Sequence, residues 1–494
     1  MHPRYTNQKI AKLFGDENKL NLWQKLELAV LQAKTELKLI PFEVYTEIER
    51  IFMTNPIDID WWKKRDAEIG HDLNAFLDER LRFLPVELQE YFHKKLTSYD
   101  TEESPFVQTL VDSLAEVEAG YMLLQIALSN LASEHRYTLM MARTHGQWAE
   151  LQSFGKRVLT WRNNVDLIFR NIIDAAQVLY LSKLAGAIGN YGSISPEVEK
   201  KTLEILGLKP FYGASQIMPR FLYAPIAQNL CNFVLELHKV ALDIRLGARS
   251  GLPILQEPFG KKQKGSSAMP HKKNTISTEN IEGQARMAKG YMLMITENIV
   301  TWEERAIEQS CVERVAWPDL FHSVNHTIKV MTKIISGLTV YTDNMLQEII
   351  DSRGTYASSE AKEFLKEQLC PLGFSHEDIY RLVQLACFNI FEADSSRLGI
   401  RSRRHKSFTE AETSLKELTA FEPETKTNLE EIIRLGRLRP SNQLEITDDQ
   451  VNAFNEALNK IFTDLTAPIE WQEIFRPANL LKNEALLYKE ILGE

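Results

Sequence analysis

The segment 258–274 holds the residues whose types and spacing are best suited to chemistry. Its sequence, PFGKKQKGSSAMPHKKN, combines two glycines, a pair of serines and a stiffening proline. It carries five lysines and a histidine in a chain that is acidic overall: Lys261, Lys262, Lys264, Lys272, Lys273 and His271. The pattern TISTENIEG follows Asn274, whose side-chain oxygen can accept a backbone N–H, so we expect Asn274 to cap a helix. A basic loop that leads into a helix N-terminus favours anion binding, although a solvated basic loop is equally compatible with the charge alone.

Three of the eleven histidines lie in segments rich in polar residues. They are His71 in EIGHDLNAF, His93 in YFHKKLTSYD and His145 in MARTHGQWAEL. Imidazole titrates near neutral pH, as a group that donates or removes a proton must. Each segment also has a purely structural interpretation. His71 could lie on a helix face, and TSYDTEE could cap a helix. His145 could lie in a polar turn before a helix that starts at residue 148.

The composition is that of a globular protein, and it excludes several classes. The 494 residues are 44% hydrophobic and 25% charged, which excludes disordered, collagen-like and disulfide-stapled chains. A net charge of −9 and a pI of about 5.8 argue against a nucleic-acid partner. The four cysteines form no CxxC pair, which disfavours a zinc ribbon and favours a reducing compartment. No apolar run approaches about 18 residues and no apolar signal core is found, so we expect no membrane partner and a cytoplasmic location.

Helical periodicity dominates the parts of the chain that must position these residues. Apolar residues recur at steps of three and four in five long segments: 107–131, 148–184, 222–248, 276–300 and 317–337. Helices of about 25 residues are about 38 Å long, which predicts an all-α fold with an elongated bundle. Several segments are apolar on more than one face, which favours burial between subunits.

The string GSSAMPHKKN, with its pattern GSSxMPxKxN, resembles the shared loop of the fumarase/aspartase superfamily. The histidine in MPHK and the segment RTHGQ are similar to the adenylosuccinate lyase family within it. The resemblance implies that Ser266 is the base that removes a proton beside a carboxylate, and that Ser267, Lys272 and Asn274 hold the succinyl carboxylates. It also implies that His145 protonates the departing nitrogen. Carboxymuconate cycloisomerases of the superfamily generally lack a histidine there.

Other segments extend the resemblance over most of the chain. EIGHDLNAF is similar to the HDVxAF stretch, which implies that His71 assists catalysis near the substrate phosphate and that Asp72 binds substrate. LTSYD resembles LTSxD, which implies that Thr97 and Ser98 bind a carboxylate. The remaining residues implied to bind substrate lie in RY, ASQIMPR, STENIEG and WEERAIEQSCVER: Arg4, Tyr5, Gln216, Glu279, Asn280, Arg305, Ser310 and Arg314.

The family resemblance implies a three-domain fumarase/aspartase-like fold, with domains 1–104, 105–345 and 346–494. It implies a homotetramer whose active sites are shared between chains, with no metal or organic cofactor. The implied reaction releases fumarate from adenylosuccinate and from succinylaminoimidazole carboxamide ribotide. Departures from the family motifs at Gly70, Lys95 and Ala306 keep open a divergent lyase acting on another succinyl amine. A carboxymuconate-type cycloisomerase and a non-catalytic scaffold are further alternatives, and the basic run 397–405 reads as a solvated surface.

Overall fold

A computed structural model describes residues 1–260, 262–269, 271–397 and 477–493. The chain forms two compact units. Unit 1 comprises Met1–Leu131, Thr160–Ser250 and Leu255–Thr339, and unit 2 comprises Ala132–Leu159, Gly251–Ile254 and Val340–Glu494. The basic run lies outside the described residues from position 398 onward. The division into domains 1–104, 105–345 and 346–494 stays a prediction.

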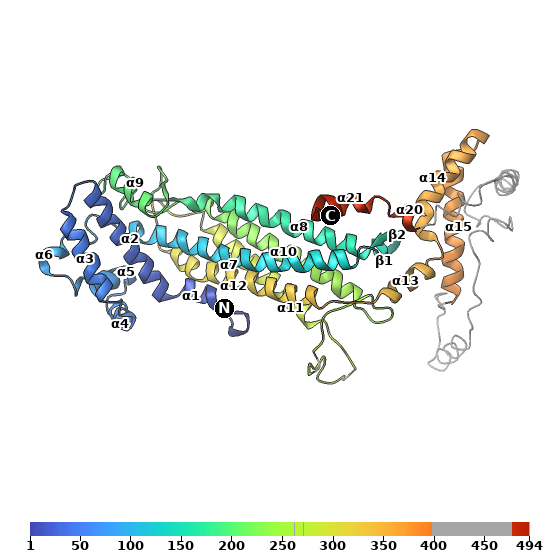
Figure 1. The fold of residues 1–494 in the computed structure, drawn as a ribbon, viewed down its shortest axis with the longest axis horizontal. Helices are drawn as coiled ribbons and strands as arrows, with labels where there is room; N and C mark the ends of the chain where they lie inside the picture. The colour runs from blue at the N-terminus through green and yellow to red at the C-terminus, as the bar shows by residue number, and fades with distance from the viewer. Residues whose placement is uncertain (261, 270, 398–476, 494) are drawn as a thin grey trace. The chain divides into compact units, whose positions relative to one another are not determined.

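The secondary structure is almost entirely helical, as expected (Figure 1). The helices up to the end of the long bundle are η1 (Pro3–Tyr5), α1 (Gln8–Leu13), α2 (Asp16–Glu36), α3 (Phe42–Thr54), α4 (Ile59–Ile69), α5 (Asp72–Leu81), α6 (Val86–Gln89), α7 (Ser98–Glu134), α8 (Phe154–Ala176), η2 (Gln177–Tyr180), α9 (Pro196–Ile205), η3 (Arg220–Leu222), α10 (Ala224–Gly247), α11 (Ile276–Glu297) and α12 (Glu308–Ser336). Those that follow are α13 (Thr342–Asp351), η4 (Thr355–Ala357), α14 (Ser358–Leu369), η5 (Cys370–Leu372), α15 (His376–Arg397), α20 (Pro477–Leu480) and α21 (Glu484–Leu492). In the described part of the chain, no helix has the length and apolar character that crossing a membrane requires.

In the described residues, six short strands form three two-stranded sheets. The strands are β1 (Leu139–Thr144), β2 (Gln147–Ser153), β3 (Leu181–Ser182), β4 (Lys209–Pro210), β5 (Leu255–Gln256) and β6 (Thr339–Val340). The β1–β2 pair is an antiparallel hairpin, whereas β3 and β4 pair in parallel. The prediction that a helix starts at residue 148 is therefore wrong for its first residues, because they belong to β2 and α8 begins only at Phe154.

Helix α7 shows how the sequence pattern builds the bundle in unit 1. Its buried apolar residues alternate at steps of three and four along the helix: Val107, Leu110, Leu114, Val117, Tyr121, Leu124, Leu128 and Leu131. This spacing keeps them on one stripe that faces the neighbouring helices. On α8, Phe169 stacks on Tyr121 with ring centroids 3.8 Å apart, and Asp166 accepts a hydrogen bond of 2.8 Å from the same tyrosine.

Helices α10, α11 and α12 run alongside α7 and complete the long bundle of unit 1 (Figure 1). Their buried faces are lined by large apolar residues, with Phe233 on α10, Ile281 on α11, and Trp317 and Phe321 on α12 all fully enclosed. The N-terminal helices α2–α6 enclose a second apolar cluster around Trp23, Phe52, Phe76 and Phe92. The residues expected to bind substrate lie both in these helices and in the segments that connect them.

Candidate active site

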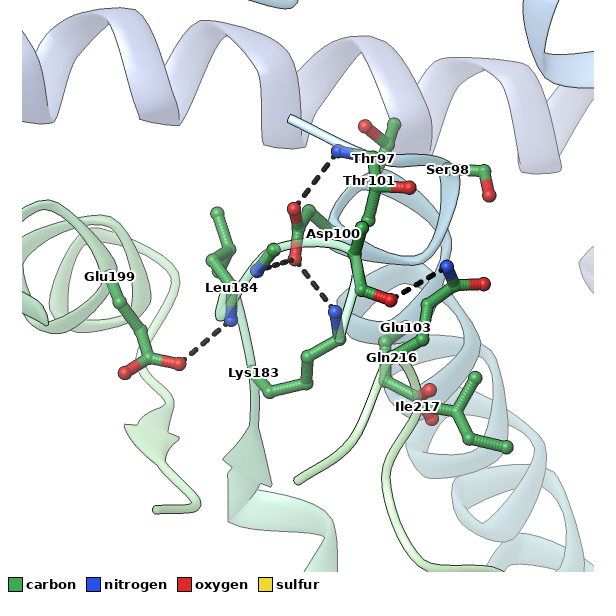
Figure 2. Close-up of polar contacts among 12 residues, drawn as sticks. Thr97, Ser98, Asp100, Thr101, Glu103, Lys183, Leu184, Glu199, Gln216 and Ile217 are labelled. Atoms are coloured by element: carbon green, nitrogen blue, oxygen red, sulfur yellow. Dashed lines mark hydrogen bonds and ion pairs between the residues drawn. The ribbon is translucent and has the colours of Figure 1, made fainter. Parts of the chain in front are cut away.

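The Thr97–Ser98 turn at the start of α7 is fixed by one buried carboxylate (Figure 2). Asp100 accepts the backbone N–H of Thr97 at 3.0 Å, which satisfies a donor at the helix N-terminus as a cap should. Its other oxygen accepts the Lys183 ammonium at 2.7 Å and the Gly186 backbone N–H at 3.2 Å. Both charged side chains are fully buried. The pair therefore ties the turn to the loop that follows β3.

Ser98, Gln216 and Arg305, which sequence analysis assigned to substrate binding, lie together in unit 1. The Arg305 guanidinium donates to the Gln216 side-chain oxygen at 2.9 Å and to the Ser98 hydroxyl at 3.4 Å. It also lies over the ring of Tyr99, 4.1 Å from the centroid. Gln216 in turn donates to the carbonyl of Ala187 at 2.9 Å. One arginine and two neutral polar groups thus converge, an arrangement that suits a carboxylate or a phosphate.

A buried ion cluster beneath these residues was missed by sequence analysis. Arg220 donates to Glu103 at 2.9 Å and to Glu313 at 2.8 Å, and Glu103 also accepts the backbone N–H of Met218. Burial raises the pKa of the Glu313 carboxyl, and the Arg220 guanidinium opposes that shift. The cluster joins α7 to α12 and holds the segment that carries Gln216. Its only signal in the sequence is the presence of charges at helix positions whose neighbours are apolar.

His71 and Asp72 lie where α5 begins. The Nδ1 atom of His71 accepts the backbone N–H of Asn74 at 3.3 Å, so a neutral His71 carries its proton on Nε2. Asp72 accepts a hydrogen bond of 3.1 Å from Arg314, and Ser310 lines the same pocket as both. The structure therefore brings together Asp72, Ser310 and Arg314, three residues that the sequence motifs assigned to substrate binding.

The GSSAMPHKKN loop precedes α11 and holds Ser266 in a turn of its own. The Oγ atom of Ser266 accepts the backbone N–H groups of Ala268 at 3.3 Å and Met269 at 3.0 Å. At the neck of the loop a side chain on Gly265 would come within 2.0 Å of the Lys272 carbonyl oxygen, so only glycine fits there. Ser267 and Lys272 are exposed. The loop thus offers one hydroxyl that accepts two backbone N–H groups, and an exposed ammonium at Lys272.

The expectation that Asn274 caps α11 is wrong. Its side-chain amide instead donates to the Gly265 carbonyl at 2.7 Å and closes the neck of the loop. The helix is capped by Glu257, whose carboxylate accepts the backbone N–H groups of Ser277 and Thr278, both at 3.0 Å. A carboxylate satisfies two helix donors and complements the helix dipole better than one amide oxygen can.

The other residues assigned to nucleotide binding fall into separate contacts. The Tyr5 hydroxyl accepts a hydrogen bond of 3.4 Å from Asn280, which also lies 2.8 Å from Nε2 of His326. Arg4 is exposed. Glu279 instead pairs with Arg245 at 3.3 Å on the exposed face of α11. Tyr5 and Asn280 are therefore brought together, whereas Glu279 already has a cationic partner.

In unit 2, His145 lies at the tip of the β1–β2 hairpin. Its φ of 54° and the φ of 81° at Gly146 make a two-residue turn that needs left-handed backbone at both positions. The side chain is exposed. Below the tip, Arg143 forms a two-fold hydrogen bond with Glu348 of α13, at 2.5 and 3.2 Å. The hairpin therefore presents the imidazole on a rigid support.

Comparison with known proteins identifies the family. Residues 25–290 match the family described as Lyase. The chain is 33% identical to adenylosuccinate lyase of Synechocystis sp. over 87% of this chain and 99% of that protein. It is 34% identical to adenylosuccinate lyase of Thermotoga maritima over 78% of this chain and 87% of that protein.

Solved structures support the same fold. A fumarate lyase from Mesorhizobium sp. superposes with a TM-score of 0.76 at 20% identity, over 100% of this chain and 99% of that one. A carboxymuconate cycloisomerase from Acinetobacter calcoaceticus gives a TM-score of 0.71 at 19% identity, over 99% and 98% of the two chains. The expected all-α, fumarase-like fold is confirmed. Together with the sequence identities, these matches show that the chain belongs to the adenylosuccinate lyase family of the fumarase/aspartase superfamily.

Proposed function

We propose that this chain cleaves adenylosuccinate into AMP and fumarate, and the related succinylaminoimidazole carboxamide ribotide into AICAR and fumarate. Both reactions are β-eliminations that break a carbon–nitrogen bond. The observation that carries the proposal is the geometry of Ser266 within the GSSAMPHKKN loop, taken with membership of the family. A hydroxyl that receives two backbone N–H groups is stabilised as an alkoxide, because those donors bind the charged form more strongly than the neutral one.

The first step removes a proton from the succinyl carbon that bears a carboxylate. The Ser266 alkoxide takes this proton, and the electron pair of the C–H bond spreads into the adjacent carboxylate. The developing negative charge needs donors that are already in place, as in an oxyanion hole. Lys272, Ser267 and Asn274 from the loop, with Thr97 and Ser98 from the start of α7, hold the two carboxylates.

The second step breaks the bond to nitrogen. The electron pair of the carbanion forms the double bond of fumarate, and the pair of the C–N bond goes to the nitrogen of the leaving group. His145 supplies a proton to that nitrogen, so that a neutral amine departs. The rigid hairpin below His145 supports this role, because a general acid must keep its geometry throughout the reaction.

The nucleotide portion is held by the remaining residues of the set. Arg305, Ser310 and Arg314 bind the phosphate and ribose, together with Arg4, Tyr5, Gln216, Glu279 and Asn280. His71 donates its Nε2–H toward the phosphate while its Nδ1 caps α5. Asp72 aligns Arg314. The contact between Glu279 and Arg245 must open, or Glu279 must act through Arg245.

We further propose a cytoplasmic homotetramer of three-domain chains, whose active sites combine residues of neighbouring chains. Exposed apolar side chains on the long helices support assembly: Met122, Leu123, Ile126, Leu167, Leu242, Leu246, Leu293 and Met294. Large exposed apolar patches mark protein–protein interfaces. Light scattering on the purified protein should give a mass four times that of the 56.9 kDa chain. A monomer or dimer that turns over adenylosuccinate at full rate would contradict this assembly.

The activity itself is tested with an ultraviolet assay on purified protein. Adenylosuccinate, argininosuccinate and malate are offered in parallel, and fumarate is measured directly in each reaction. We expect fumarate from adenylosuccinate alone. Fumarate from another substrate of the panel, or none from adenylosuccinate, would reject the proposed substrate.

A further inference from the structure

A pocket in unit 1 lies beside the residues proposed to bind the nucleotide. Its cavity volume of about 340 Å³ falls in the range of small-molecule sites, roughly 300–1,000 Å³. Phe14, Trp23 and Phe106 line it with aromatic surface, while Ser310 and Arg314 of α12 contribute polar groups. The pocket is thus continuous with the proposed phosphate and ribose contacts.

The pocket combines groups that favour an anion with four carboxyl groups, those of Asp16, Asp72, Glu102 and Glu313. Ser310 lies in the first turn of α12, where backbone N–H groups and the helix dipole favour negative charge. Lys19 of α2 and Arg314 add two cationic side chains. Both cations contact Asp72, at 3.6 and 3.1 Å, so their charge is only partly available to a ligand.

Glu102, in the first turns of α7, is a carboxyl of this pocket that the reaction scheme leaves unused. It lines the pocket and is partly buried, and its carboxyl has no hydrogen-bond or ion-pair partner among the residues that the structure describes. The nearest cations are engaged elsewhere, since Arg314 pairs with Asp72 and Arg305 bonds to Ser98 and Gln216. A half-buried carboxylate without a partner is less well solvated than one in water, and protonation or a bond to a ligand relieves that loss.

The ionisation of Glu102 fits a group poised between two states. Burial raises its pKa to about 7, with the Asp72 carboxylate adding to the shift and Arg305, Arg314 and Lys19 opposing it. A phosphate dianion on Ser310 and Arg314 would neutralise part of that opposing charge. Phosphate oxygens only accept hydrogen bonds, so a carboxylate at Glu102 would repel them whereas a carboxylic acid would donate to one.

We propose that Glu102 binds the nucleotide as a carboxylic acid, donating a hydrogen bond to an oxygen of its phosphate–ribose portion, so that nucleotide binding takes up a proton. This inference rests on the proposed function. It makes Glu102 a specificity residue for ligands with an acceptor oxygen in the pocket. Whether protons are taken up or released on nucleotide binding is decisive. A Glu102 carboxylate that accepted hydrogen bonds from ribose hydroxyls would instead release protons on binding.

The charged groups around Glu102 come from every element that packs on it. They are Asp16 and Lys19 on α2, Asp72 on α5, Tyr99 on α7 itself, Arg220 on η3, Arg305 before α12, and Glu313 and Arg314 on α12. Glu313 is already neutralised by Arg220. Burial raises the pKa of Tyr99 far above neutrality, so its hydroxyl stays protonated.

The test is calorimetric titration of the whole protein with AMP at pH 8, in Tris and in HEPES. The dependence of the heat on the ionisation enthalpy of the buffer gives the number of protons taken up. A carboxyl of pKa about 7 is roughly one-tenth protonated at pH 8, so wild type should take up as many as about 0.9 protons per AMP. A phosphate whose second pKa is about 6 is already a dianion there and contributes little.

Variants of the protein show which residue takes up the proton when AMP binds. Glu102→Gln keeps a neutral donor, so it should bind AMP at pH 8 at least as tightly as wild type, with a gain of up to about tenfold. Its proton uptake should fall by about half a proton or more. Glu118→Gln, an exposed residue of the same helix, should match wild type. His71→Gln, which removes the other candidate proton acceptor near the phosphate, should retain the uptake.

The outcomes separate this inference from the proposed function. A difference between wild type and Glu102→Gln smaller than about half a proton, proton release, or loss of AMP binding in Glu102→Gln overturns the inference. Should Glu102→Gln not fold, the AMP dissociation constant of wild type decides the matter. It should weaken about fivefold from pH 7 to pH 8, and a flat profile overturns the inference. Wild type that neither binds AMP nor releases fumarate from adenylosuccinate instead defeats the proposed function.

Discussion

Replacing Lys183 by methionine tests how the start of α7 is held. The substitution removes the ammonium that lies 2.7 Å from Asp100 and keeps an unbranched apolar side chain of similar length. Both partners are fully buried, so water cannot replace the lost charge. Asp100 would keep only the backbone N–H groups of Thr97 and Gly186.

The expected cost follows from this geometry. Removing one partner of a buried ion pair costs about 3–5 kcal/mol, because the other charge is left uncompensated. The two backbone donors that remain place Lys183→Met near the lower end, at about 3 kcal/mol.

The assay is urea unfolding followed by circular dichroism, with turnover of adenylosuccinate measured on the same samples. Lys201→Met is the matched control, because Lys201 pairs with Glu36 at 2.8 Å on the surface and its loss should cost less than about 1 kcal/mol. Adding Asp100→Asn to Lys183→Met should recover part of the loss by removing the buried charge. A Lys183→Met variant as stable as Lys201→Met would refute the reasoning.

Three further predictions concern the loop and the backbone around the site. Gly265→Ala must displace the Lys272 carbonyl, so kcat/KM should fall about 10²-fold with an unchanged urea midpoint, and normal turnover would contradict the packing at the neck of the loop. Lys95 has a φ of 68°, so Lys95→Gly should raise the free energy of unfolding by up to about 1 kcal/mol, and a clear loss would show that the strain is absent. Burial opposes protonation of His93, but the Glu27 carboxylate 2.7 Å away outweighs it and raises the pKa of the imidazole. That stability is complete below about pH 6.5 and is lost as the pH rises through the raised pKa, so His93→Gln should shift the urea midpoint more at pH 6 than at pH 8.5, and equal shifts would exclude the linkage.

The long helices could be predicted from the sequence because their periodicity is strong. Segments 107–131, 222–248 and 276–300 lie within or close to α7, α10 and α11. The segment 317–337 places the start of its helix too far along the chain, since α12 begins at Glu308 and continues through Pro318. The hairpin at His145 was missed because its turn uses a histidine at a left-handed position, where asparagine or glycine is the usual signal.

The chemistry-bearing residues could be found from local motifs, but their supports could not. Lys183 and Asp100 are 83 residues apart in the chain, and Arg220 lies 117 residues from Glu103. A buried charge can be interpreted only once its partner is known, and periodicity carries no information on partners so distant. The prediction that Asn274 caps α11 failed for a related reason. The N–H groups at the start of that helix are bound by Glu257, which lies outside the local sequence motif.

The central claim is that the Ser266 hydroxyl removes the proton from the succinyl carbon. Its most direct test is Ser266→Ala, with kcat measured on adenylosuccinate and substrate affinity measured separately by calorimetry. Loss of a general base typically lowers a rate by about 10²–10⁴-fold, so kcat should fall within or beyond that range while the substrate still binds. A correctly folded Ser266→Ala protein that releases fumarate at nearly the wild-type rate would contradict the account.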